Sequence, residues 1–330
     1  MVEAADKKAF QTEMVERAIE RSRGDVEDRV VVITGGARGI GKAMAEGLLR
    51  AGAKVAVVDK TLAGADELRQ QLESSGRGTA VEMDITDDEQ IDAAQARITE
   101  ALGPADVLVN NAALVSETLF APTGRVRMLD TSDADWKTMF EVNVFGVVKT
   151  IRHFIGPMIE KGSGSIINVV SSGVLPVAGG GGWFGLRPFT LEMPYQSTKA
   201  AIMAMTFYLG DEVRAQGVAV NAIMPGHTRA SWFDATANAW QEKGVVYGFR
   251  PVVSEHLVPI TLFLAGQDGS GVTGMLYSVP DWNHDHGYGK YLDWTDHSFP
   301  ENLEAMYAKA EEAMPAGRPA MGLQTPAMRR

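Results

Sequence analysis

The sequence of 330 residues contains no cysteine. Disulfides, thiolate zinc sites and cysteine nucleophiles are therefore excluded, while the redox compartment is left open. No run of apolar residues approaches the roughly 20 that span a bilayer. The first 28 residues contain acids throughout and lack the apolar core of a secretory signal. We therefore expect a cytoplasmic protein with no membrane partner.

Basic residues are fewer than acidic residues. The chain has 31 Lys and Arg against 42 Asp and Glu, which gives a formal net charge of −11. Non-specific binding to nucleic acid or to an anionic membrane requires basic patches that displace counterions. We therefore expect a small-molecule partner and no nucleic acid. Apolar residues at 45% and charged residues at 22% are typical of an ordered globular chain.

Short β-branched runs recur along the chain and alternate with helical patterns. They cover residues 30–34, 54–59, 79–84, 106–110, 165–170, 218–223 and 275–279. Near-continuous apolar runs of this kind suit strands that are buried on both faces, as in a parallel sheet with helices on each side. The alternation predicts an α/β fold, a doubly wound parallel sheet of the Rossmann-like kind with about seven strands.

We expect one domain with added segments rather than two domains. Residues 1–28 form an N-terminal helical arm, in which Phe10, Met14 and Ala18 recur at a four-residue spacing. That spacing predicts an amphipathic helix, packed either on the body or on a neighbouring subunit. Residues 29–280 form the Rossmann-fold domain, with a Gly-rich insert at about 173–194, and residues 281–330 form a C-terminal extension.

The first predicted strand runs into T-G-G-A-R-G-I-G, Thr34 to Gly41, and then into a helical pattern. Glycines at this turn let the backbone approach a pyrophosphate, whose charge is favoured by the free N–H groups at the start of the helix. A strand before the turn and a helix after it make an ordinary turn a poor explanation. The predicted cofactor residues here are Gly35, Arg38, Gly39, Ile40 and Gly41.

An acid, Asp59, ends the second predicted strand about 20 residues beyond the glycine turn, where a carboxylate can accept hydrogen bonds from the ribose hydroxyls of NAD. It would also repel the 2′-phosphate of NADP. Arg38 and Lys60 favour the opposite choice, because both could pair with that phosphate. We expect NAD, since the position of Asp59 at the strand end fixes it against the ribose, and NADP is the alternative.

Two further strand ends carry polar residues. Asp84 and Ile85 could meet the adenine rim, or Asp84 could simply cap its strand. N-N-A-A, Asn110 to Ala113, follows the fourth strand, and asparagines there can satisfy backbone groups and line a cleft at the carboxyl ends of a parallel sheet. We include Asn111 among the cofactor residues.

Later in the chain, Y-Q-S-T-K places Tyr195 and Lys199 four residues apart in an Ala-rich helical pattern. Residues at this spacing lie on one face of a helix, so both can point into the cleft. A nearby ammonium should lower the pKa of the phenol from its usual value of about 10. Tyr195 could then take a proton from an alcohol or return one to a carbonyl.

The glycine turn, N-N-A-A, Y-Q-S-T-K and the P-G pair at Pro225 and Gly226 occur in this order, and over roughly residues 29–280 the chain resembles the short-chain dehydrogenase/reductase family. The resemblance implies that Lys199 also holds the nicotinamide ribose. It further implies that a serine orients the substrate oxygen, where Ser171 is favoured over Ser172, and that Asn143 anchors a relay water.

The resemblance also extends to a loop on the nicotinamide side of the cofactor. It implies that this loop starts at Pro225 and that the backbone of Thr228 meets the carboxamide. A threonine common near the end of that loop is replaced here by Ala230, with Ser231 next.

The insert and the C-terminal extension have no counterpart in the resemblance. Trp183, Phe184 and Phe189 beside four glycines suggest a lid over a bulky substrate, with a subunit-contact loop as the alternative. In the extension, residues 284–286 (H-D-H) could bind a metal, but an ordinary polar loop is the better explanation, so no metal site is expected. Four aromatic residues there should pack across a subunit boundary or cap the pocket: Trp282, Tyr288, Tyr291 and Trp294.

These observations predict an NAD-dependent oxidoreductase that interconverts a secondary alcohol and a ketone, on a bulky apolar or aromatic substrate, as a homo-oligomer (a dimer or a tetramer). An NADP-dependent carbonyl reductase and a non-catalytic nucleotide-binding scaffold are the alternatives. An epimerase or dehydratase that recycles bound NAD is a third.

Overall fold

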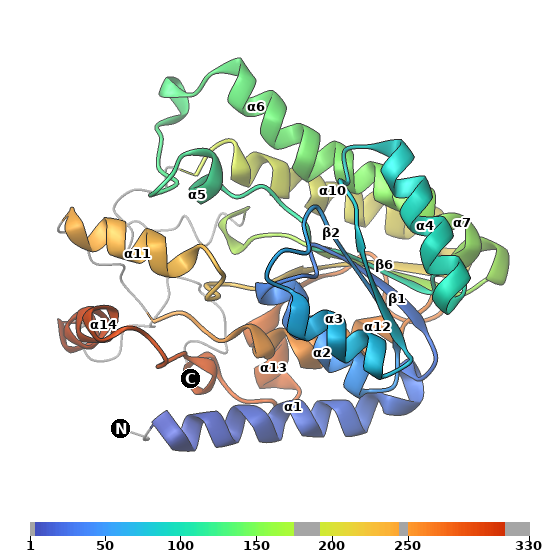
Figure 1. Ribbon diagram of the computed structural model, residues 1–330, viewed down its shortest axis with the longest axis horizontal. Helices are drawn as coiled ribbons and strands as arrows, with labels where there is room; N and C mark the ends of the chain where they lie inside the picture. Colours follow the sequence, from blue (N-terminus) through green and yellow to red (C-terminus); the bar gives the residue numbers. More distant parts are fainter. Residues whose placement is uncertain (1–3, 175–191, 244–249, 314–330) are drawn as a thin grey trace.

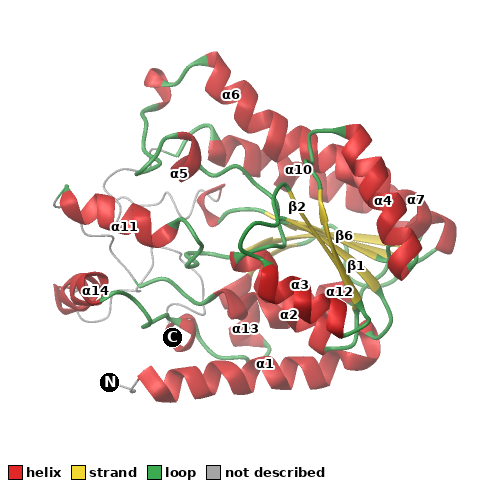
Figure 2. Cartoon of the chain, viewed as in Figure 1, coloured by secondary structure: helices red, strands yellow, loops and turns green. Residues whose placement is uncertain are grey.

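The computed structural model describes residues 4–174, 192–243 and 250–313. A seven-stranded sheet with every strand pair parallel forms its centre, in the order β3-β2-β1-β4-β5-β6-β7 (Figure 2). The strands are β1 Val30–Thr34, β2 Lys54–Asp59, β3 Gly78–Glu82, β4 Val107–Asn110, β5 Gly164–Val169, β6 Val218–Met224 and β7 Leu276–Ser278. The predicted doubly wound parallel sheet is therefore confirmed, with strand ends that shift by no more than two residues.

Helices cover both faces of the sheet (Figure 1). One face carries α1 Ala4–Val26, α2 Gly39–Arg50, α3 Asp66–Ser74, α12 Val258–Ala265 and α13 Val279–Asp285, and the other carries α4 Asp88–Leu102, α7 Gly146–Lys161 and α10 Tyr195–Arg214. The remaining helical segments are α5 Ser116–Leu119, η1 Met128–Asp130, α6 Asp133–Phe140, the π-helical turn η2 Glu141–Phe145, η3 Ser172–Val174, α11 Phe233–Glu242, η4 Ser254–Leu257, η5 Tyr291–Trp294 and α14 Glu301–Ala313.

Alternation along β1 shows why its apolar run suits this position. Val31 and Ile33 face the core under α2 and α12, while Val30 and Val32 face the core under α4 and α7. Successive side chains of a strand point to opposite faces, so a strand covered on both sides must be apolar throughout. The sheet is thus buried on both faces, and chemistry is confined to the ends of its strands.

The strand order reverses between β1 and β4, because the chain first builds outward to β3 and then returns to pair β4 with β1. At such a switch point the loops after the two strands diverge and open a crevice beyond their carboxyl ends. The glycine turn follows β1 and the N-N-A-A segment follows β4, so both open onto this crevice.

Both ends of the described chain pack on its own body. Met14 and Ala18 of α1 are buried in the core cluster that includes α12, which decides between the two packings expected for the arm. Phe10 meets Trp294 edge to face at 6.4 Å. The expectation that the extension's aromatic residues cross a subunit boundary or cap the pocket is wrong, because all four are at most 6% exposed within this chain's own core: Trp282, Tyr288, Tyr291 and Trp294.

Residues 175–191, which hold most of the predicted insert, lie outside the described residues. Within the described residues, no helix is long and apolar enough to cross a membrane. The cytoplasmic location and the division at residues 28 and 280 stay predictions.

Candidate active site

The turn after β1 is shaped by glycine. Gly35 and Gly39 adopt φ values of 63° and 54°, in the left-handed region that glycine enters without strain. A Cβ on Gly41 would lie 2.2 Å from the carbonyl oxygen of Gly35, so the first turn of α2 can pack on the loop only with glycine there. Asn111 clamps the loop from the β4 side, because its amide donates to the carbonyls of Thr34 and Gly35 at 3.1 and 2.9 Å.

A cavity of about 600 Å³ opens beside this turn, at the crevice between the ends of β1 and β4. Of the predicted cofactor residues, only Gly41 is absent from its wall, since it packs beneath the loop. The others line the cavity: Gly35, Arg38, Gly39, Ile40, Asp59, Asp84, Ile85, Asn111, Tyr195, Lys199, Pro225 and Thr228.

At the outer end of this cavity, acids and bases are paired. Asp59 accepts a hydrogen bond from the backbone of Ala37 at 3.2 Å and lies 3.9 Å from Arg38. Lys60 pairs with Asp84 at 2.7 Å. Partial burial of Asp84 opposes ionisation, but the hydrogen bonds from Lys60 and Thr86 prevail and lower its pKa. Asp84 therefore holds its own turn, as a strand cap does, in addition to lining the cavity.

Tyr195 and Lys199 occupy the first two turns of α10 and line the inner end of the cavity. The ammonium nitrogen of Lys199 lies 5.7 Å from the centre of the Tyr195 ring and donates to the carbonyl of Val169 at 2.8 Å. The side chain of Lys199 is thereby anchored on the end of β5. One face of the helix therefore presents both groups to the cavity, as the spacing predicts.

The expected direction of the tyrosine pKa is wrong for this arrangement. Burial, followed by the carboxylates of Glu117 and Glu192, raises the pKa of Tyr195 above its usual value. Burial also lowers the pKa of Lys199 to about 8, so the cation that should favour phenolate is itself disfavoured. Burial thus disfavours the charged form of each group.

The two candidate serines differ in what they face. Ser171 lines the large cavity and also a smaller one beside it, and its hydroxyl accepts a hydrogen bond from the backbone of Gly173 at 3.3 Å. Ser172 lines only the smaller cavity and is 9% exposed. Ser171 is thus the serine that lies at the junction of the two cavities together with Tyr195.

Asn143 lies in the π-helical turn η2 and is almost fully buried. Its amide oxygen accepts from the backbone of Leu114 at 2.7 Å, and its nitrogen donates to the carbonyl of Leu114 at 2.8 Å and to the hydroxyl of Thr198 at 3.1 Å. Asn143 does not line either cavity. It joins the loop after β4 to α10 from behind the cavity wall.

The smaller cavity, of about 110 Å³, adjoins Tyr195 on the side away from the glycine turn. Its wall includes four residues that the sequence analysis did not select: Glu117, Glu192, His227 and Trp232. Glu192 accepts a hydrogen bond from Gln196 at 2.6 Å. No spacing rule identifies these residues, because they come from three separate segments (α5, the residues before α10, and the loop between β6 and α11) that meet only in the folded chain. Of the four residues, only His227 carried a signal in the sequence, because it follows Pro225 of the predicted nicotinamide-side loop by two positions.

The large cavity has the chemistry of a dinucleotide site. A glycine-lined turn at a helix start, an acid at the end of β2 and a lysine under a tyrosine would contact a pyrophosphate, a ribose and the reactive end of the cofactor, respectively. Within residues 4–174, 192–243 and 250–313, no group of three or more His, Asp or Glu is placed to hold a metal ion. His286 instead stacks on Trp282, with ring centres 4.0 Å apart.

Comparison with known proteins agrees with this site. The family model described as short chain dehydrogenase matches residues 29–242. A putative short-chain alcohol dehydrogenase from Sinorhizobium meliloti 1021 has a similar structure, with a TM-score of 0.62 at 26% identity, and the match covers 77% of this chain and 95% of that one.

Two curated relatives extend the comparison. Fluoren-9-ol dehydrogenase from Terrabacter sp. (strain DBF63) is 61% identical over 308 residues, which cover 93% of this chain and 86% of that protein. 2,3-Dihydro-2,3-dihydroxybenzoate dehydrogenase from Bacillus subtilis (strain 168) is 32% identical over 231 residues, which cover 68% of this chain and 81% of that protein. The chain belongs to the short-chain dehydrogenase family and is an NAD(P)-dependent oxidoreductase that acts on a CH–OH group.

Proposed function

We propose that the enzyme interconverts a bulky aromatic secondary alcohol of the fluoren-9-ol type and its ketone, with NAD as the preferred cofactor. The observation that supports this most directly is the position of Tyr195 and Ser171, which line both the dinucleotide-sized cavity and the smaller one. A hydroxyl bound in the smaller cavity would meet both side chains while its carbinol carbon faces the larger one.

The substrate proposal rests on the relative named fluoren-9-ol dehydrogenase and on the cavity wall. Trp232 and Val115 line both cavities, and His227 adds a flat ring to the smaller one. Flat apolar rings suit a fused aromatic substrate, because aromatic pairs gain dispersion energy and favourable edge contacts beyond simple burial. The predicted lid at Trp183, Phe184 and Phe189 belongs to this proposal and lies outside the described residues.

A bound nicotinamide cofactor would supply the hydride acceptor for the carbinol carbon in oxidation and the hydride donor for the ketone carbon in reduction. Tyr195 takes the hydroxyl proton during oxidation and gives it back during reduction. Ser171 donates a hydrogen bond to the substrate oxygen and so fixes it against the phenol. Lys199, anchored on Val169, would hold the ribose of a bound cofactor and place an ammonium group next to the Tyr195 ring.

In this proposal Asn143 does not contact the substrate directly. Its bonds to the backbone of Leu114 hold the loop after β4 against α10. The family resemblance implies that this asparagine anchors a relay water, and a water between Asn143 and Lys199 would complete a path for the proton to solvent.

The preference for NAD rests on the charges at the end of β2. Asp59 is only 11% exposed and is held by the backbone of Ala37, so it cannot turn away from a ribose in the cavity. Arg38 is 55% exposed, and Lys60 is already paired with Asp84. The 2′-phosphate of NADP would lie beside the Asp59 carboxylate, and the repulsion between the two negative charges disfavours NADP.

Assembly as a homo-oligomer is also part of the proposal. Phe207 and Tyr208, next to each other on α10, are 38% and 80% exposed, and Phe145 on η2 is 52% exposed. Because α10 contacts η2, the two elements that carry these exposed rings are neighbours. Exposed aromatic rings on neighbouring elements favour a contact with a second copy of the chain.

The function is tested by incubating the purified enzyme with fluoren-9-ol and NAD and following NADH absorbance. Turnover that is lost in Tyr195→Phe, while NADH still binds, is the expected result. A Tyr195→Phe enzyme with unchanged turnover would remove the acid-base role, and turnover of small alcohols alone would remove the bulky-substrate proposal.

A further inference from the structure

Helix α11 follows directly after Trp232, which lines both cavities, and is packed between two other segments. On one side, Thr236 donates to the carbonyl of Pro122 at 3.1 Å, and the guanidinium of Arg125 lies 3.2 Å from the ring centre of Trp240. On the other side, α11 meets α14 of the C-terminal extension, where Phe233, Trp240 and Tyr307 belong to one buried cluster. The family match ends at residue 242, so α14 is an addition that follows it.

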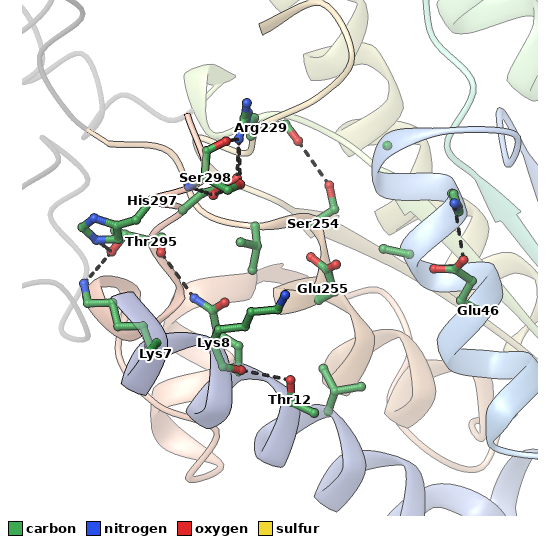
Figure 3. Close-up of a pocket in the computed structure, with 18 of the residues that line it drawn as sticks. Lys7, Lys8, Thr12, Glu46, Arg229, Ser254, Glu255, Thr295, His297 and Ser298 are labelled. Atoms are coloured by element: carbon green, nitrogen blue, oxygen red, sulfur yellow. Dashed lines mark hydrogen bonds and ion pairs between the residues drawn. The ribbon is translucent and has the colours of Figure 1, made fainter. Parts of the chain in front are cut away.

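Arg229 joins this helix to the extension. It forms a two-pronged pair with Asp234 of α11 at 2.9 and 2.6 Å, and it contacts Asp296 at 3.1 Å. It also donates to the backbone and hydroxyl oxygens of Ser298, as Figure 3 shows. Arg229 directly follows Thr228, which lines the large cavity. The side chain of Arg229 therefore connects both the extension and α11 to the same point of the active site.

A second arginine anchors α14 itself. Arg250 is 3% exposed, and its guanidinium pairs with Glu304 of α14 at 3.0 Å. A buried guanidinium without its carboxylate is strongly unfavourable, so this pair restricts where α14 can lie. The base of the extension is held independently, because Lys7 of α1 donates to Thr295 at 2.8 Å (Figure 3).

A chain of ring contacts connects α14 to the substrate cavity. Trp232 is the residue immediately before α11 and lines both cavities. Its ring lies 5.8 Å from that of Phe233, which meets His227 at 5.1 Å and Tyr307 of α14 at 6.5 Å. A shift of α14 would therefore be transmitted through Phe233 to two side chains of the substrate cavity.

We propose that the C-terminal extension is a substrate-positioning element, in which Arg229 and Arg250 fix α11 and thereby hold Trp232 against the substrate cavity beside Tyr195. Arg250 and Glu304 are positioning residues and do not touch the reacting atoms. The glycine turn and Asp59 lie at the other end of the large cavity, so the element should govern the KM for a bulky alcohol and leave cofactor binding unchanged. This inference rests on the proposed function for its substrate.

The test compares Glu304→Gln with Glu301→Gln, which makes the same charge change at an exposed position of the same helix. For Glu304→Gln we expect the KM for fluoren-9-ol to rise about fivefold or more with little change in kcat, and the NADH Kd to stay within about twofold. Glu301→Gln should match the unaltered enzyme. Equal KM values in the two variants, or an NADH Kd that rises in parallel with KM, would overturn the inference.

A second measurement needs no substrate. Hydrogen exchange of the amides of residues 233–242 should be faster in Glu304→Gln than in Glu301→Gln, while exchange in β6 stays the same. Equal exchange in α11 would overturn the inference, whereas failure of the unaltered enzyme to oxidise fluoren-9-ol would overturn only the proposed function. If Glu304→Gln does not fold, Asn302→Ala provides the variant, because it removes only exposed hydrogen bonds from α14 to Asn238 and Gln241.

Discussion

Tyr195 and Lys199 stand one turn apart on α10, with the ammonium 5.7 Å from the ring centre, and the site disfavours the charged form of each. The phenol is held protonated at neutral pH, and the lysine has a pKa of about 8. A protonated phenol is ready to donate to a ketone oxygen, but it must lose its proton before it can accept one from an alcohol. This relationship determines the expected pH behaviour of the enzyme.

Alcohol oxidation should accelerate with pH. Because the Tyr195 pKa is raised, the phenolate fraction increases throughout the range from about pH 7 to 10, and kcat/KM for oxidation should rise by up to about tenfold per pH unit. Glu117→Gln removes a carboxylate that raises this pKa, so its profile should move to lower pH. Glu160→Gln, an exposed change on α7, is the control. A pH-independent oxidation rate would contradict the role of the phenol.

Alanine substitutions of the two candidate serines should lower kcat/KM by different amounts. Ser171→Ala should lower kcat/KM by about a hundredfold, because loss of one preorganised donor at a developing oxyanion costs that much or more. Ser172→Ala should change it by less than about threefold, since Ser172 lines only the smaller cavity. Steady-state kinetics of both variants decides the question, and the reverse order would make Ser172 the orienting residue.

Cofactor choice should depend on one carboxylate. Asp59→Ala removes the group that would accept the ribose hydroxyls and leaves Arg38 free to pair with a 2′-phosphate. We expect the ratio of NADPH to NADH affinity to rise by about tenfold or more, which corresponds to about 1.4 kcal/mol. Titration by tryptophan fluorescence measures both constants without substrate. An unchanged ratio would show that Asp59 does not select the cofactor.

Two glycine substitutions should have opposite effects on stability. Gly41→Ala places a Cβ 2.2 Å from the Gly35 carbonyl, so we expect a loss of about 2 kcal/mol or more of unfolding free energy, and weaker NADH binding. A Cβ on Gly24 in α1 would meet nothing within 4 Å, so Gly24→Ala should stabilise by about 0.5–1 kcal/mol through helix propensity. Denaturant titration checks both values. A neutral Gly41→Ala would mean that the loop can relax.

The sequence by itself determined the sheet and the location of the chemistry. Apolar runs without alternation, such as residues 30–34 and 218–223, can only be satisfied between two layers of helices, so the strands could be predicted to within two residues. The glycine turn and the Tyr195–Lys199 spacing are local features whose geometry follows from one turn and one helix. For that reason their joint position in one cavity was predictable from the order of the motifs.

The tertiary structure alone decided what depends on contacts between distant segments. Burial reversed the expected direction of the Tyr195 pKa, and Glu117, which also raises it, lies on α5 nearly 80 residues away in the chain. The arm and the extension proved to cover the chain's own core, where Phe10 meets Trp294. Desolvation and long-range pairing, as between Arg250 and Glu304, depend on the packed whole, and no local pattern in the sequence encodes them.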